Sequence, residues 1–344
     1  MRTRASAAPR LTVVAIVVAL GAVASGETGE THQYQYVMGT SVEVQVFGRD
    51  EASRREAIAE AFAAFHDVDH LMSNYRADSE LARVNRDAAQ HAVTITDPLF
   101  AVLDAARRVS VASNGAFDVT VGPLMKLWGF HDKTPHVPTA AELAAIRPLV
   151  DYRNMRLDEP HHNVAFVRPR VELDLGGIAK GFAVEIAAQV LRRRGLDGFI
   201  DAGGNQYLLG TPPGKRVWTI GIENPIVPGQ LLGALETGET SVSTSADSSN
   251  FLIAGNRRYG HILDPRTLEP STASLSVTIL SRDGTLADAM SKAAFVLGPK
   301  DGLALVDSFP GMAGVIAYGK PDGSIGVAMS AGLAAAYHPA AAAY

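Results

Sequence analysis

The sequence contains no cysteine among its 344 residues. This excludes disulfide bonds, metal sites built on thiolates and attachment to a membrane through a lipid-modified cysteine. A large excess of one charge is also missing, because 31 lysines and arginines face 36 aspartates and glutamates, for a net charge of −5. Since acidic and basic residues are interleaved, the composition gives no indication of binding to nucleic acid or to an anionic membrane surface.

The N-terminus has the pattern of a secretory signal peptide, which we assign to residues 1–25. Three arginines precede an apolar run from Leu11 to Ala24, and the run ends in an A-x-A cleavage pattern. The run is short and its side chains are small, which argues against a membrane-spanning helix; an uncleaved N-terminal anchor is the alternative. We therefore expect an exported, periplasmic protein, attached to the inner membrane only if this segment is retained.

The rest of the chain is predicted to form one domain. Residues 26–36 form a polar lead-in, residues 37–335 the domain, and residues 336–344 a loose alanine-rich tail. Helical periodicity predicts helices at about 51–71, 98–113 and 287–298.

The stretch from Glu172 to Asn205 organises the domain. It predicts a short strand at 171–175, a Gly176-Gly177 turn, a helix and a second strand at 198–201. The free N–H groups at the start of that helix would make a site for an anion such as a phosphate, and the anion would compensate Lys180 in the first turn. Neither GxGxxG nor GxxxxGK[ST] occurs in this stretch, so a plain strand–helix–strand unit is the alternative.

Other residues are candidates for chemistry, each with a plainer interpretation. His66 and His70 share a helix face, as zinc ligands do, but no third ligand is evident and a solvated face is the alternative. His261 is a candidate general base or a structural histidine. Asp288 and Lys292 are one turn apart on an apolar helix, so we expect the pair to be buried or to line a site.

Eight motifs taken together resemble the FAD:protein FMN transferases of the ApbE type. In chain order they are MGT (Met38–Thr40), MSNYRADSEL (Met72–Leu81), GAFDVTVGPLMKLWGF (Gly115–Phe130), ELDLGGIAKGFAVE (Glu172–Glu185), DAGGN (Asp201–Asn205), STSAD (Ser243–Asp247), HILDPRT (His261–Thr267) and ADAMSKAAFVLG (Ala287–Gly298). Each motif is weak alone, but the set covers nearly the whole chain after the signal peptide, in the order of the family.

The resemblance implies a fold and an activity. The fold is α/β (α+β, with mixed sheets), with two lobes and FAD in the cleft between them. The activity is cleavage of FAD at its pyrophosphate and attachment of FMN by a phosphoester bond to a threonine of an acceptor protein, with release of AMP. A divalent cation, usually Mg²⁺, assists.

The resemblance also implies roles for residues at matching positions. Asp174 and Lys180 contact FAD, while the Gly177 carbonyl and the Asp288 carboxylate bind the metal. His261 takes the proton from the acceptor threonine. Tyr75 matches an aromatic residue that stacks on the flavin. The other positions that match FAD contacts are Met38, Ala116, Phe117, Asp118 and Ile262.

Three departures from the family pattern keep other functions open. Lys292 stands where many members have a metal-binding threonine, and an ammonium cannot ligate a cation. Ser248 replaces a common aromatic residue, and Leu268 replaces a glycine that often follows DPRT. The alternatives are an FAD-binding protein or an FAD pyrophosphatase with weakened transferase activity and, further away, a zinc hydrolase built on His66 and His70.

Overall fold

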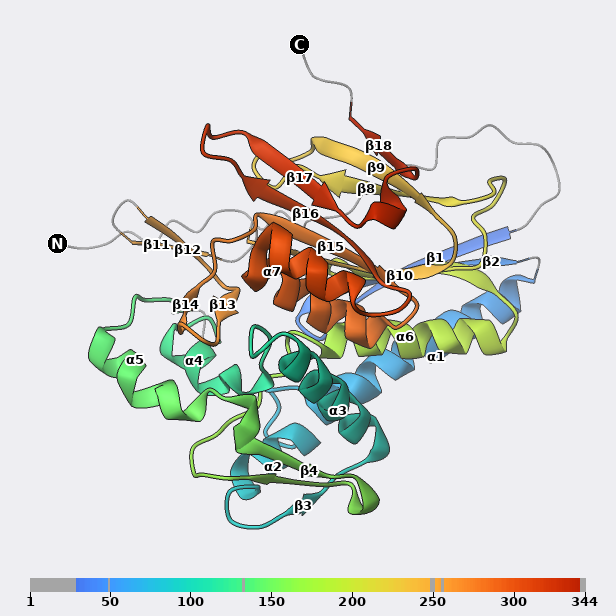
Figure 1. Cartoon of the computed structure of the whole chain (residues 1–344). Helices are drawn as coiled ribbons and strands as arrows, with labels where there is room; N and C mark the ends of the chain where they lie inside the picture. Colours follow the sequence, from blue (N-terminus) through green and yellow to red (C-terminus); the bar gives the residue numbers. More distant parts are fainter. Residues whose placement is uncertain (1–28, 49, 132–133, 248–250, 255–256, 341–344) are drawn as a thin grey trace.

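The structure, a computed structural model, describes residues 29–48, 50–131, 134–247, 251–254 and 257–340. The predicted signal peptide, the first residues of the lead-in, Ser248 and the end of the tail lie outside these residues. Within them, helices alternate with antiparallel sheets in two lobes, which confirms the expected α+β class (Figure 1). No helix in the described part of the chain has the length and apolar character needed to span a membrane.

One large antiparallel sheet forms the upper lobe in Figure 1, with the strand order β1-β2-β6-β7-β10-β15-β16-β17. The strands are β1 (Gly29–Val37), β2 (Thr40–Gly48), β6 (Asp197–Ala202), β7 (Asn205–Leu209), β10 (Thr240–Ala246), β15 (Ser276–Ser281), β16 (Ala313–Gly319) and β17 (Ile325–Met329).

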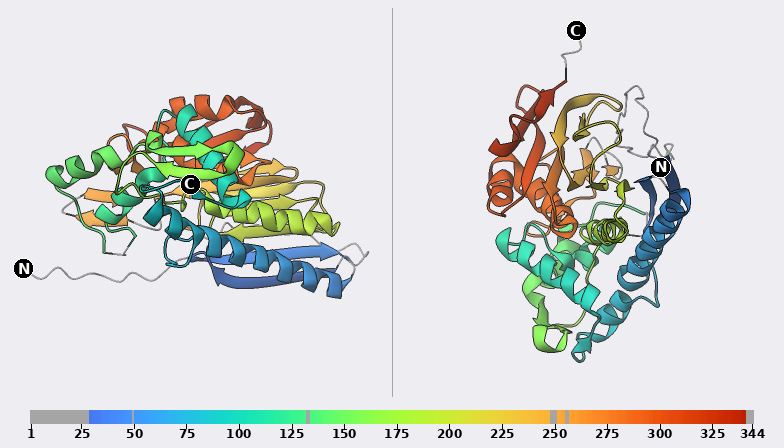
Figure 2. Two further views of the ribbon diagram at one scale, coloured as in Figure 1. Left: turned by 90° about the horizontal axis from the view of Figure 1, so that it is seen from below. Right: turned by 90° about the vertical axis from the view of Figure 1, so that its right-hand side faces the viewer.

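Three helices cover one face of this sheet: α1 (Glu51–Met72), α6 (Ala179–Arg193) and α7 (Gly284–Asp307). The end-on view in Figure 2 shows α6 between α1 and α7. A small sheet of β8 (Trp218–Glu223), β9 (Leu231–Thr237) and β18 (Tyr337–Pro339) covers the other face. Because alternate side chains of a strand point to opposite faces, Ile200 packs in the core under the helices and Phe199 in the core under the small sheet.

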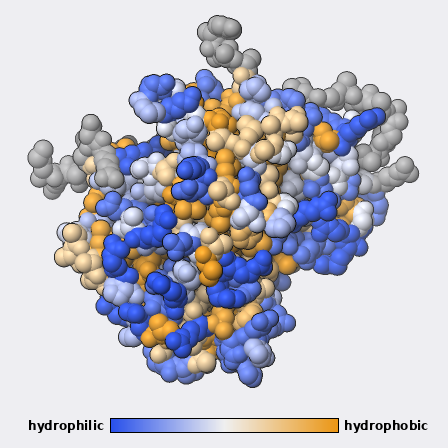
Figure 3. Space-filling model, viewed as in Figure 1, coloured by the Kyte–Doolittle hydropathy of each residue, from blue (hydrophilic) through white to orange (hydrophobic). Residues whose placement is uncertain are grey.

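Apart from helix α3, the lower lobe is built from short elements (Figure 1). Its elements are α2 (Glu80–Asp87), β3 (Val93–Thr94), α3 (Asp97–Ala112), η1 (Val119–Val121), α4 (Gly122–Leu127), α5 (Ala140–Ile146), η2 (Arg147–Leu149), η3 (Tyr152–Asn154), β4 (Met155–Asp158), η4 (Glu159–His161) and β5 (Asn163–Phe166). The remaining elements are the hairpins β11 (Phe251–Ala254) with β12 (Arg257–Gly260) and β13 (Leu263–Asp264) with β14 (Glu269–Pro270), and η5 (Ala331–Leu333). Figure 3 shows that hydrophilic residues cover most of the visible face, with apolar residues scattered among them.

The structure corrects two predicted ends of the domain. Residues 29–36 of the predicted lead-in belong to the edge strand β1, which continues to Val37 and pairs with β2 along its whole length. Residues 337–339 of the predicted loose tail pair with β9. Both strands were missed because their side chains are largely polar or exposed, so they carry little of the apolar alternation that identifies a strand.

The last predicted helix is longer than the sequence pattern indicated. It begins at Gly284, and a second helical segment continues beyond Gly298 to Asp307. Gly298 itself is not helical, with φ of 78°, so the helix is interrupted at the residue where the predicted helix ends.

Candidate functional site

Helix α6 begins directly after the Gly176-Gly177 turn, with Ile178 as its N-cap. The apolar Ile178 side chain does not cap this end by a hydrogen bond. The N–H of Gly176 donates to Asp174 Oδ1 at 2.8 Å, and Lys180 Nζ donates to the Gly176 carbonyl at 3.2 Å. The lysine therefore folds back over the turn, beside a helix N-terminus that favours an anion.

The segment before the turn is not the strand that we predicted. The Leu173 N–H donates to Asn85 Oδ1 at 2.7 Å, and the Leu173 carbonyl accepts a hydrogen bond from Asn85 Nδ2 at 3.0 Å. One amide side chain thus takes the place of a neighbouring strand. The Asp174 N–H donates to the Val119 carbonyl at 2.7 Å, which fixes the next residue against the lower lobe. Apolar alternation alone could not show that the partner was a side chain.

Asp288 lies at the contact between α7 and the first turn of α6. Its side chain is fully buried, and Oδ2 accepts a 2.9 Å hydrogen bond from the N–H of Gly181. A Cβ added to Gly181 would lie 2.2 Å from the Gly284 carbonyl oxygen and 2.5 Å from Asp288 Cβ. Only glycine therefore lets the two helices approach this closely.

Lys292 forms an ion pair with Asp288 Oδ1, as the spacing of the two residues predicted. Its Cγ lies 3.9 Å from the position that a Cβ on Gly177 would occupy, so its aliphatic stem passes the glycine turn. Burial lowers the pKa of Lys292, against the opposing effect of Asp288 and with a further lowering by the charge of Lys180. Two lysines thus converge on the turn, where Lys292 is paired with Asp288 and Asp174 accepts the Gly176 N–H.

Asp118 is a buried carboxylate that directly follows Phe117 in the lower lobe. Its Oδ1 accepts the N–H and the hydroxyl of Thr120, both at 2.7 Å, which caps η1. Burial is the main cause that raises the pKa of Asp118 to about 6. The preceding residue, Phe117, places Cε2 3.1 Å from the position of a Cβ on Gly177, so the aromatic ring also lies against the turn.

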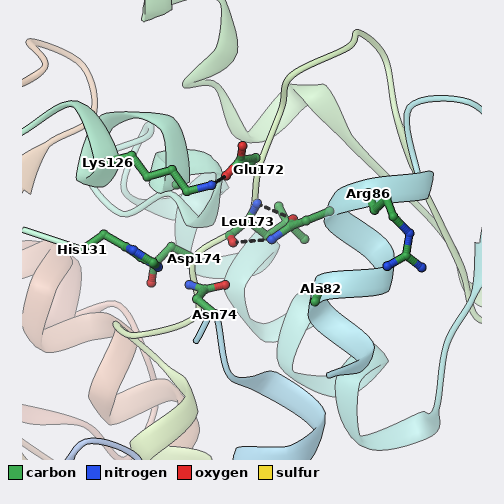
Figure 4. Close-up of a pocket in the computed structure, with 10 residues that line it drawn as sticks. Asn74, Ala82, Arg86, Lys126, His131, Glu172, Leu173 and Asp174 are labelled. Carbon is green, nitrogen blue, oxygen red and sulfur yellow. Dashed lines mark hydrogen bonds and ion pairs between the residues drawn. The ribbon is translucent and has the colours of Figure 1, made fainter. Parts of the chain in front are cut away.

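Asp174 lines a pocket together with Asn74, Lys126, His131 and Glu172 (Figure 4). Lys126 forms an ion pair with Glu172 at its edge. Tyr75 is 71% exposed, and its ring stacks on the His131 ring with centroids 4.6 Å apart and planes 17° apart. His131 was not assigned a role from the sequence, and no motif indicated this stacking.

His261 lies beside a carboxylate that the sequence analysis did not single out. Its Nδ1 is 3.8 Å from Oδ1 of Asp247. Burial raises the pKa of Asp247 to about 6, although the backbone N–H of Ile262 donates to the carboxylate. A Cβ on Gly260 would lie 2.0 Å from Asp247 Oδ2, so the hairpin backbone closes over this group. The Ile262 side chain is buried in the main core, as is Ala116.

The remaining motifs meet at neighbouring turns. Met38 and Gly39 form the β1–β2 turn with positive φ, and Thr40 Oγ1 lies 2.5 Å from the position of a Cβ on Gly203. Asn205 follows, and its Oδ1 accepts the Ser243 hydroxyl at 2.7 Å. The Ser243 hydroxyl in turn lies 3.5 Å from Asp288 Oδ1.

Motifs of the lower lobe also pack beside those of the upper lobe. Arg266 Cγ lies 3.8 Å from the position of a Cβ on Gly115, so the DPRT turn packs beside the segment that carries Phe117 and Asp118. Residues more than a hundred positions apart in the chain are therefore gathered around the start of α6. Most of these residues lie in motifs identified from the sequence, but the sequence could not show which of them are in contact.

The side chains at Asp288 do not fit a divalent cation in this arrangement. One carboxylate oxygen accepts from Gly181 and the other is paired with the Lys292 ammonium, which would repel a dication. Mg²⁺ is usually bound through one or two carboxylates together with waters and phosphate oxygens, and here the carboxylate that would serve is already paired with an ammonium.

The predicted zinc alternative also finds no ligand set. His66 Nε2 lies 3.0 Å from the side-chain oxygen of Gln35. Residues 29–340, apart from the gaps stated above, hold no group of three or more His, Cys, Asp or Glu side chains suited to a metal ion.

Comparisons with known proteins agree with this arrangement. The model of the ApbE family matches residues 38–316. An FAD:protein FMN transferase of Klebsiella pneumoniae is 33% identical over 78% of this chain and 83% of its own length. A transferase of the same name from Treponema pallidum is 31% identical, over 87% of this chain and 88% of its own.

Solved structures show the same fold. The crystal structure of the ApbE protein of Thermotoga maritima superposes with a TM-score of 0.79 at 29% identity, over 87% of this chain and 97% of that one. The flavin transferase ApbE of Vibrio cholerae gives 0.80 at 28% identity, over 89% and 99% of the two chains. On the family match, the curated relatives and the shared fold, this chain belongs to the ApbE family.

Proposed function

We propose that this chain is an FAD:protein FMN transferase. The observation that carries the proposal is the meeting of Asp288, Lys292 and Lys180 at the Gly176-Gly177 turn, where α6 begins. A helix N-terminus with two ammonium groups suits a diphosphate, which is the part of FAD that the reaction cleaves. The curated relatives named above carry this activity in their names.

The reaction is a phosphoryl-group transfer, in which positioning and neutralisation of charge supply most of the catalysis. The threonine hydroxyl of an acceptor protein attacks the phosphorus of the FMN half of FAD. A P–O bond forms to the threonine, the bridging P–O bond to the AMP half breaks, and AMP leaves with the bridging oxygen.

His261 is proposed to accept the hydroxyl proton. Asp247 lies on its Nδ1 side, which favours a proton on Nδ1 and leaves Nε2 as the base. Lys180 and Lys292 would balance the charge on the phosphates. These side chains account for each bond and proton in the step, so no part of it is assigned to Mg²⁺, which the resemblance implies but which Asp288 does not fit while it is paired with Lys292.

The other predicted FAD contacts are proposed to hold the rest of the FAD molecule. Phe117 lies against Gly177, and Asp118 follows it. Asp174 lines the adjoining pocket, and Tyr75 stacks on His131 at its edge, where a flavin ring would replace or extend the stack. Met38, Ala116 and Ile262 are proposed to contribute backbone and apolar contacts.

The partner is an acceptor protein that carries a threonine. We also propose that the enzyme acts after export, in the periplasm, on the basis of the predicted signal peptide at residues 1–25. The acceptor protein would then meet the enzyme outside the cytoplasm.

Incubating the purified protein with FAD and a panel of threonine-bearing acceptor proteins tests the function. The proposal expects a fluorescent flavin band that survives denaturing electrophoresis, and one AMP released for each flavin attached. AMP release without labelling would identify a pyrophosphatase instead. FAD binding with neither product would identify an FAD-binding protein.

A further inference from the structure

In this chain the positive charge beside Asp288 is the ammonium group of Lys292. Lys292 lies one helical turn after Asp288 on α7, and its ammonium pairs with Oδ1. The other oxygen accepts the Gly181 N–H at 2.9 Å, so both oxygens of this fully buried carboxylate already have partners. The pair is fixed by two packed helices, and the ammonium cannot move far without leaving a buried charge unpaired.

A phosphate bound at the Gly176-Gly177 turn would lie close to the Lys292 ammonium. The lysine stem passes within 3.9 Å of the position that a Cβ on Gly177 would occupy. Lys180 approaches the same turn and donates to the Gly176 carbonyl at 3.2 Å. The Lys180 and Lys292 ammonium groups lie here with the Asp288 and Asp174 carboxylates, beside the N-terminus of α6. The helix N-terminus and the two ammonium groups can bind an anion such as a phosphate.

We infer that the Lys292 ammonium, held by Asp288, takes the place of a divalent cation at this site and makes FAD binding and FMN transfer by this chain independent of divalent metal. The inference rests on the transferase function proposed above. Lys292 is a binding residue for the diphosphate in this scheme, and Asp288 is the positioning residue that holds it.

The test compares wild-type protein in excess EDTA with the same protein in MgCl₂. FAD affinity, measured by calorimetry or by quenching of flavin fluorescence, is expected to agree within about twofold between the two conditions, a free-energy difference below half a kcal/mol. The rate of acceptor labelling should agree equally well. A loss of affinity or rate of about tenfold or more in EDTA, restored by Mg²⁺, overturns the inference.

Variants show whether Lys292 itself supplies the charge. Lys292→Thr should bind FAD at least about tenfold more weakly in EDTA and recover in MgCl₂, since it frees Asp288 for a metal. Lys292→Met combined with Asp288→Asn removes both charges and leaves no buried ion unpaired, so it should fold and still bind FAD weakly in both conditions. Lys300→Met, an exposed lysine of the same helix, is the matched control and should change nothing.

The two proposals fail in different ways. If the wild type labels no acceptor in either condition, the transferase function fails, while FAD affinity with and without Mg²⁺ still decides the role of Lys292. If the doubly substituted variant binds FAD in EDTA as tightly as the wild type, Lys292 does not act on the diphosphate and the inference is wrong.

Discussion

The backbone N–H of Gly181 donates a 2.9 Å hydrogen bond to the buried carboxylate of Asp288. This bond joins the first turn of α6 to the middle of the first segment of α7, and it sets the distance between the glycine turn and the pair of Asp288 and Lys292. The geometry of the proposed diphosphate site therefore depends on how closely two helices pack.

Replacing Gly181 with alanine should separate these helices. The new Cβ would lie 2.2 Å from the Gly284 carbonyl oxygen and 2.5 Å from Asp288 Cβ. Such overpacking costs about 1–3 kcal/mol. We expect a loss of that size in the free energy of unfolding, measured in denaturant, and weaker FAD binding. Gly238→Ala is the control, because nothing lies within 4 Å of its added Cβ; equal stability of the two variants would contradict the packing argument.

Replacing His261 with glutamine should slow transfer without weakening FAD binding. Loss of a general base lowers the rate by about 10²–10⁴-fold. Asp247→Asn should also slow transfer, by less, because it removes only the group beside Nδ1. Rates of acceptor labelling and FAD affinity are measured side by side, with the exposed His91→Gln as control. A His261 variant with the wild-type rate would remove this residue from the mechanism.

Asp118 should make stability depend on pH. Its pKa is raised from 3.8 to about 6 in the folded protein, so folding favours the protonated form. The destabilisation is absent below the unfolded pKa, grows as pH rises through the range from about 4 to about 6, and reaches about 3 kcal/mol at neutral pH.

Asp118→Asn cannot ionise and isolates this effect. The free energy of unfolding of the wild type, minus that of the variant, should fall by about 3 kcal/mol between pH 3 and pH 7. A difference that stays constant across this range would show that Asp118 ionises as easily in the folded protein as in the unfolded chain.

Leu268 is held in a conformation that suits glycine. Its φ is 68°, its side chain is fully buried, and its carbonyl accepts the Trp128 indole N–H at 3.0 Å. Leu268→Ala should cost about 2–5 kcal/mol through loss of packing. Leu268→Gly loses one more carbon but relieves the strain of about 1–2 kcal/mol.

The glycine variant should therefore be at least as stable as the alanine variant, the reverse of the usual order. Chemical denaturation of the two proteins decides the order. A glycine variant that is clearly less stable than the alanine variant would show that the left-handed backbone costs little here.

Sequence periodicity predicted the helices well because each carries an apolar stripe or a cap. Helix α1 was predicted at about 51–71 and spans Glu51–Met72, and the helix predicted at about 98–113 spans Asp97–Ala112. The prediction of a strand at Val171–Leu175 was wrong. The sequence pattern of an extended apolar segment is the same whether the segment pairs with a strand or with the side chain of Asn85. The polar edge strand β1 was missed because little of it is buried, so its sequence lacks apolar alternation.

Much of the site was named from the motifs, but its contacts were not. Asp288 and Lys292 pair as their helical spacing predicted. Gly181, Asp247 and His131 were not assigned roles, although the first two lie inside quoted motifs. Their importance comes from what packs against them across the fold, and no spacing along the chain records such a contact.

Mass analysis of an acceptor protein tests the central claim most directly. The purified chain is incubated with FAD and an acceptor, and the intact mass and the modified peptide of the acceptor are determined. The account predicts a mass increase equal to FMN minus water, located on one threonine and lost when that threonine becomes alanine. An unmodified acceptor, in the presence of intact enzyme with bound FAD, would contradict it.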